Sequence, residues 1–182
     1  MDPDPDPGPE VETLVLAMPR RELFRIHGFV PPLDMAVLES VAEEAWYASP
    51  SVLVGSFDAK EVRVGVVVLT ATKALVSEAG VLLHATPVPP EAGQMGTGLG
   101  ALKNFSLAAA RHLLGHPGGR IELSGFCNED ALPECRGVFI LVYRLIVADD
   151  CPAPDGMEWV DRSGLGRIPL DPVSALVMDV AK

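Results

Sequence analysis

The sequence predicts an α/β sandwich, in which a mixed central sheet lies between helices. Two aliphatic runs, residues 62–69 and 137–147, are nearly continuous, as expected of strands that are covered on both faces. Residues 33–47 place their apolar side chains at helical spacing, and Asp171-Pro172 is typical of a helix start. With 182 residues, 48% of them apolar, the chain is long enough for one substantial core and short for two.

The first half of the chain begins with a short apolar segment, residues 14–24, which leads to the helix predicted over 33–47. Pro31-Pro32 precedes that helix and Ser49-Pro50 ends it. After the strand at 62–69, residues 73–84 are predicted to form a hairpin or a strand pair around a turn at 78–80. The glycine-rich and proline-rich stretch 87–100 is the longest irregular segment, and such loops are usually functional or disordered.

The second half is predicted to be mostly sheet. A helix over 104–114 is followed by strands at 120–126 and 137–147, and the second strand is long enough to bend or to carry a bulge. The connector 149–156 is rich in turn residues, and the chain closes with the helix that begins after Asp171.

The amino terminus differs from the rest in composition. Five of the 25 acidic residues lie in the first twelve positions, interleaved with prolines that cannot join a helix or a sheet ladder. Residues 1–12 are therefore predicted to be a disordered acidic tail, and residues 13–182 a single domain.

Charge and cysteine content exclude several classes of protein. A net charge of −11 argues against general affinity for nucleic acid or for anionic membranes. The sequence has neither a secretion leader nor an apolar run of the ~20 residues that a membrane helix needs, so a cytoplasmic location is predicted. Three cysteines without a Cys-x-x-Cys pair are predicted to be reduced and buried or half-buried, with zinc binding the weaker alternative.

The segment from Gly96 to Gly119 resembles the box of the Nudix hydrolases, Gly-x5-Glu-x7-Arg-Glu-U-x-Glu-Glu-x-Gly-U, where U is aliphatic. Aligned on Arg111, the pattern also keeps Leu113 and Gly118, whereas Thr97 and Gly119 replace its first glycine and last aliphatic residue. The four positions that carry glutamate in the family are occupied here by Lys103, His112, Gly115 and His116.

The order of the surrounding elements extends this resemblance over residues 14–181, to a group of bacterial Nudix-type proteins with a Gly-Phe-x-Asn turn after the box helix. The resemblance implies a Nudix-like α/β/α sandwich with a mixed central sheet. Enzymes of the family use divalent metals to cleave diphosphates, and Mg²⁺ and Mn²⁺ need hard oxygen ligands. Because the box carboxylates are absent, the sequence predicts neither catalytic residues, nor a metal site, nor a cofactor.

The residues that remain at the start of the helix favour binding of a phosphate-containing small molecule. Gly98 and Gly100 lie where a helix N-terminus would offer its amide groups, and Lys103 and Arg111 would add positive charge. A plain flexible loop is the alternative for the glycines, because a dinucleotide loop or a P-loop needs other spacings. His112 and His116 have a zinc-binding spacing, but the glycines after Leu114 end the helix between them.

Two function classes follow. The favoured one is a non-catalytic Nudix-fold protein that binds a ligand or a protein partner, as a sensor, subunit, scaffold or homo-oligomer. The alternative is a divergent hydrolase of a nucleoside-diphosphate derivative that uses relocated carboxylates, for which the candidates after the helix are Glu122, Glu129, Asp130 and Glu134.

Overall fold

A mixed nine-stranded sheet forms the centre of the molecule in the computed structural model, which describes residues 12–32, 36–115 and 118–182. Six strands follow the order β2-β7-β8-β4-β1-β3, while β5 and β6 also pair with β4, and β9 pairs with β5. The strands are β1 Val15–Pro19, β2 Gly28–Val30, β3 Trp46–Ala48, β4 Ala59–Leu69, β5 Lys73–Ser77, β6 His84–Pro87, β7 Arg120–Asn128, β8 Val138–Ile146 and β9 Met157–Asp161.

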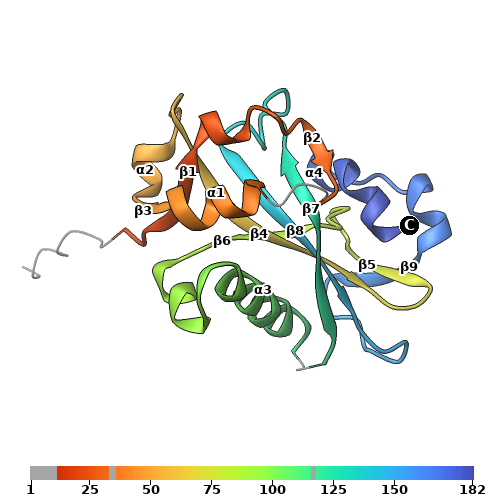
Figure 1. The fold of residues 1–182 in the computed structure, drawn as a ribbon. Helices are drawn as coiled ribbons and strands as arrows, with labels where there is room; N and C mark the ends of the chain where they lie inside the picture. The colour runs from red at the N-terminus through yellow and green to blue at the C-terminus, as the bar shows by residue number, and fades with distance from the viewer. Residues whose placement is uncertain (1–11, 33–35, 116–117) are drawn as a thin grey trace, which may run out of the picture.

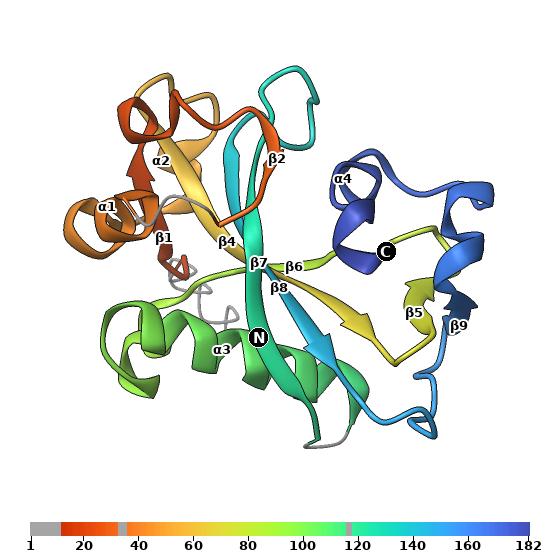
Figure 2. The same cartoon turned by 45° about the vertical axis from the view of Figure 1, so that its right-hand side comes forward.

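Helices cover both faces of this sheet (Figures 1 and 2). The α-helices are α1 Ala36–Glu44, α2 Pro50–Leu53, α3 Gly98–Leu114 and α4 Pro172–Leu176, and the 3-10 helices are η1 Arg20–Leu23, η2 Pro90–Met95, η3 Arg162–Arg167 and η4 Met178–Ala181. The α/β sandwich predicted from the sequence is therefore confirmed. In the described part of the chain no helix is long and apolar enough to cross a membrane.

The central strands β4 and β8 run parallel, in register from Glu61 opposite Val138 to Leu69 opposite Ile146. Alternate residues of β4 point to opposite faces: Val62, Val64, Val66 and Val68 pack with α1 and α3, whereas Val67 and Leu69 pack with η4. This two-sided burial explains why both strands are nearly continuous runs of aliphatic residues in the sequence.

The helix predicted over 33–47 is shorter than expected. α1 ends at Glu44, and Trp46 and Tyr47 belong to β3, where they pair with Ala17 and Leu16 of β1. Aromatic residues fit a pleated sheet well, so the pairing with β1 overrides the helical spacing. The start of the prediction, residues 33–35, lies outside the described residues.

The prediction for 73–84 was wrong in its pairing. β5 and β6 do not pair with each other within the described structure: both join β4, and β5 takes β9 as its second neighbour. The bulge expected in 137–147 lies instead in the facing strand β7, where the register shifts between Leu123 and Gly125.

The end of α3 and the start of α4 agree with their sequence signals, whereas α3 begins at Gly98, six residues before the predicted start and within the stretch predicted to be irregular. α3 stops at Gly115, which adopts a left-handed φ of 68° and donates its N–H to the Arg111 carbonyl at 2.9 Å. One carboxylate oxygen of Asp171 caps α4 by accepting from the amides of Val173 (3.0 Å) and Ser174 (3.2 Å).

The predicted tail falls on residues that the structure does not describe, except for Glu12. The Glu12 carboxylate accepts a hydrogen bond from the Ser51 amide at 2.8 Å, which connects it to α2. The division into a tail and one domain stays a prediction.

Candidate functional site

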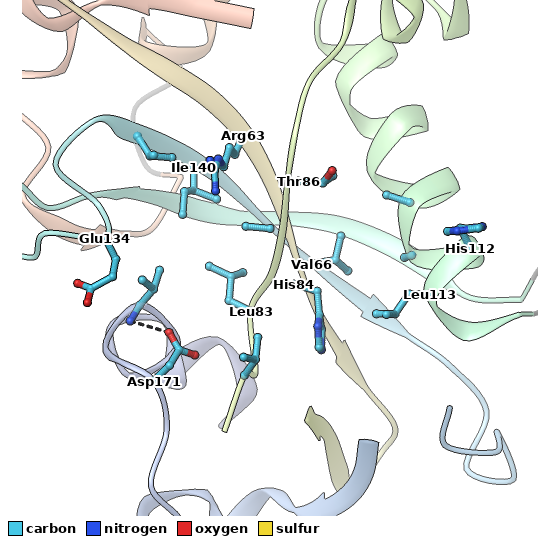
Figure 3. Close-up of a pocket in the computed structure, with 16 residues that line it drawn as sticks. Arg63, Val66, Leu83, His84, Thr86, His112, Leu113, Glu134, Ile140 and Asp171 are labelled. Carbon is cyan, nitrogen blue, oxygen red and sulfur yellow. Dashed lines mark hydrogen bonds between the residues drawn. The ribbon is translucent and has the colours of Figure 1, made fainter. Parts of the chain in front are cut away.

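A pocket of about 520 Å³ lies around β6, with α3 on one side and α4 on the other (Figure 3). The α3 side is lined by Val66, His84, Thr86, Ala109, Ala110, His112 and Leu113. The α4 side is lined by Arg63, Val81, Leu83, Glu134, Val138, Ile140, Asp171 and Val173. Sheet register explains this division, because His84 and Thr86 face Val66 and Val64 across the β4–β6 pair, on the sheet face that α3 covers.

His112 connects the pocket to the box helix. In the alignment predicted from the sequence it stands at a position where the Nudix pattern has glutamate, and it lies on the pocket flank of α3 beside Leu113 (Figure 3). Lys103 precedes it by nine residues, which at 100° per residue places the two side chains on opposite sides of the helix. Of these two side chains, only the His112 imidazole lines the pocket.

His84 places a buried ring nitrogen on the α3 side. Burial lowers the pKa of His84, and the negative charge of Asp171 and a hydrogen bond with the Leu75 backbone oppose this shift. The lowered pKa favours the neutral form of the ring. Its Nε2 atom is buried and has no hydrogen-bond partner in the described structure.

On the α4 side of the pocket, Arg63 and Asp171 already interact with other groups of the protein. Arg63 donates to Glu61 through Nε at 2.6 Å, within β4. One oxygen of Asp171 caps α4, while the other is buried without a hydrogen-bond partner among the described residues. Glu134 is exposed at the edge of the pocket.

The relocated carboxylates of the alternative hypothesis do not meet in this pocket, which only Glu134 of the four lines. Glu122 forms ion pairs with Arg120 and, at 2.7 Å, with Arg144. Glu129 accepts from the Ala131 amide, and Asp130 binds Arg20 and Lys60. Among the residues that the structure describes, no three His, Cys, Asp or Glu side chains are close enough together to hold a metal.

The predicted phosphate-binding residues lie elsewhere on α3. Gly98 and Gly100 are exposed at its first turn, and Gly98 lines a second pocket of about 210 Å³ together with Tyr47. Lys103 and Arg111 are exposed on the flank away from the larger pocket, about 12 Å apart along the helix axis. The structure thus brings Gly98, Gly100 and Lys103 to one end of α3 but does not bring Arg111 to them. Binding of a ligand by these four residues stays a prediction.

Sequence reasoning missed Arg63, Thr86 and Asp171 as pocket residues. Asp171 carried a signal only as a helix cap, and a single threonine or arginine within an apolar strand carries none. These residues meet because β6 and α4 pack around the same part of β4, which no local pattern encodes.

Comparison with known proteins identifies the fold. No protein-family model matches the chain, and no curated protein sequence matches it. The crystal structure of Tm1382, a proposed Nudix hydrolase, superposes with a TM-score of 0.75 at 13% identity, covering 92% of this chain and 97% of that one.

Two further structures are less similar. A proposed oxidoreductase from Sinorhizobium meliloti 1021, SMa0793, has a TM-score of 0.46 at 16% identity, over 74% of this chain and 44% of that one. A Nudix-family hydrolase from Clostridium perfringens has a TM-score of 0.33 at 13% identity, over 68% and 99% of the two chains. The match to Tm1382 spans nearly the whole length of both proteins, and the chain therefore has the Nudix fold.

Proposed function

We propose that this chain is a Nudix-fold binding protein without metal-dependent hydrolase activity, and that its ligand occupies the pocket between α3, β6 and α4. The observation that carries the proposal is His112. It brings an imidazole into the pocket from a box position that carries a glutamate in the family pattern.

The chemistry of the pocket acids supports the absence of metal catalysis. Mg²⁺ binds through several oxygen ligands in octahedral geometry. Asp171 and Glu134 are the acids that line the pocket, both on its α4 side, and Asp171 uses one oxygen to cap α4. Two carboxylates, one of them committed to a helix cap, supply too few oxygens to replace the box glutamates.

The ligand is proposed to contain phosphate. His84, Thr86 and His112 line the α3 side, where no pocket residue is an acid, and they surround an apolar floor formed by Val66 and Ala110. The Thr86 hydroxyl and the His112 imidazole can donate hydrogen bonds to phosphate oxygens without a metal. Lys103 and Arg111 lie on the other flank and provide the alternative site that the sequence predicts. The alternative for a non-catalytic domain is that it binds a protein partner or a second copy of this chain. The cytoplasmic location stays a prediction.

Hydrolysis assays test the first half of this proposal. Purified protein should not hydrolyse nucleoside-diphosphate sugars, dinucleoside polyphosphates or ADP-ribose above background with Mg²⁺ or Mn²⁺. Robust turnover that Glu134→Gln or Asp130→Asn abolishes would establish the hydrolase with relocated carboxylates.

Calorimetric titration with ADP-ribose in the presence of EDTA tests the second half. Binding should be weakened about tenfold by Thr86→Val or His112→Leu, since each removes a hydrogen-bonding group worth about 1.4 kcal/mol. Lys103→Glu is the matched control on the opposite flank of α3. Loss of binding in Lys103→Glu or Arg111→Ala, with Thr86→Val unaffected, would move the site to the N-terminal half of the helix.

A further inference from the structure

A further pocket, of about 540 Å³, lies where the central strands β4 and β8 begin. Its walls come from Arg20 of η1, from residues 55–57 before β4, and from the turn between β7 and β8, which contributes Asp130 and Arg136. It shares no lining residue with the pocket around β6. We propose that this Arg20 pocket binds a small molecule in which a phosphate or carboxylate group is attached to an aromatic ring.

Two buried cations at this pocket share a single carboxylate. The side chains of Arg20 (17% exposed) and Lys60 (1% exposed) bind the same oxygen of Asp130, at 2.9 and 2.7 Å. Arg20 also donates to the Arg136 carbonyl at 2.5 Å. Lys60 also donates to the Asn128 side-chain oxygen at 2.5 Å. Both of these acceptors are neutral, so one carboxylate balances two buried cations, and a further anion in the pocket would compensate the excess charge.

Arg136 and Ser56 offer donors for this anion from the pocket wall. Arg136 is exposed and adds a third positive charge; its Nε atom donates a 3.4 Å hydrogen bond to the Asp130 carbonyl. No described residue binds the two Nη atoms of Arg136, and a planar guanidinium matches phosphate or carboxylate oxygens. The Ser56 hydroxyl accepts from the amides of Asp58 (3.3 Å) and Ala59 (3.1 Å), so its own hydrogen remains available to an anion.

Phe57 supplies the apolar part of the site. Its side chain is 92% exposed, and the exposed Pro133 lines the same pocket. A ligand ring against Phe57 would remove apolar surface from water and gain the additional stability of an aromatic pair. Because Phe57 and Arg136 line one pocket, the ligand is expected to carry its ring next to its anionic group.

The excess of cations in this pocket is a local property. The whole protein has a net charge of −11, which repels anions in general. Asp130 is the acid that lines the pocket, and Arg20 and Arg136 line it as well. An anion is therefore expected to bind here through these specific contacts and not through long-range attraction to the protein.

Amide NMR of the isotope-labelled full-length protein tests the site without any substitution. Titration with phenyl phosphate or benzoate should give saturable shifts of the signals of residues 55–57 and Gly137. A response to either probe supports the proposal, and the tighter of the two identifies the anionic group. The proposal fails if neither probe shifts these signals, or if benzyl alcohol, which has the ring without the anion, shifts them equally. It also fails if the shifts are confined to Ala85, Thr86 and Ala110 at the pocket around β6, a result that leaves the proposed function intact.

Two exposed side chains allow the contacts to be tested by substitution. Arg136→Gln should weaken binding of the active probe about tenfold, because a charge-assisted hydrogen bond is lost. Arg167→Gln is the matched control, since it makes the same change in net charge at an exposed arginine of η3, outside the pocket. Phe57→Ala should weaken binding of phenyl phosphate about fivefold and leave that of methyl phosphate unchanged.

The amide spectrum of each variant shows whether it is folded. Equal losses in Arg136→Gln and Arg167→Gln would overturn the anion contact, because net charge alone would then explain the affinity. An unchanged affinity for phenyl phosphate in Phe57→Ala would overturn the aromatic part of the proposal.

Discussion

Replacing Gly80 with alanine tests how the C-terminal segment is joined to the sheet. Gly80 is buried in the turn after β5 and has a left-handed φ of +77°. A Cβ atom there would lie 2.2 Å from the carbonyl oxygen of Pro169. The Gly80 carbonyl also accepts from the Asp171 amide at 3.1 Å, so this contact positions the cap of α4 and one wall of the pocket.

The cost of Gly80→Ala has two parts. Alanine in a left-handed conformation costs about 1 kcal/mol. Relief of the contact with Pro169 requires a shift of about an ångström in a packed segment, and such overpacking costs about 1–3 kcal/mol. The free energy of unfolding should therefore fall by roughly 3 kcal/mol, which for a chain of this size lowers the melting temperature by about 6–12 °C.

Gly156→Ala is the matched control. Gly156 has nearly the same φ, +74°, but a Cβ atom there would meet nothing within 4 Å. That variant should lose only the conformational part, about 1 kcal/mol or about 2–4 °C. Urea unfolding and thermal melts followed by circular dichroism measure both variants. Equal losses in the two variants would refute the close approach of Gly80 to Pro169.

Three further predictions concern stability. Burial lowers the pKa of Lys60 below 10.5 despite the opposing Asp130, so the unfolded chain binds more protons at alkaline pH. Urea titrations should show the free energy of unfolding rising as the pH approaches 10.5, and Lys60→Met should lack that rise. Ser174→Ala should lower the free energy of unfolding in urea by about 2–4 kcal/mol, because the buried Ser174 hydroxyl accepts from two backbone amides at 2.8 and 3.0 Å. Ser124→Ala is the control and should be close to neutral, because the Ser124 hydroxyl has no partner among the described residues. Deletion of residues 1–9 should leave the melting temperature nearly unchanged, and a drop of several degrees would show that the tail docks on the domain.

The local chemistry of the sequence determined the elements whose signals do not depend on distant partners. The aliphatic runs of β4 and β8 could be recognised because strands buried on both faces need apolar residues at every position. Gly115 and Asp171 marked a helix end and a helix start because each satisfies backbone groups of its own helix. The absence of glutamate from the four positions aligned with the Nudix pattern, Lys103, His112, Gly115 and His116, is likewise read from the sequence alone.

Pairing and packing between segments distant in the sequence determined the remaining strands and the pocket. Trp46 and Tyr47 continue a helical pattern, yet they form β3 because β1 offers them backbone partners. The pairing of β5 with β9 joins segments some 80 residues apart, and no turn signal in the sequence encodes it. The pocket has the same origin, since His84 and His112 come from separate elements that meet only when β6 pairs with β4 and α3 packs on the sheet face to which His84 points. The sequence shows which side chains the protein contains, but tertiary packing determines which of them lie together in one site.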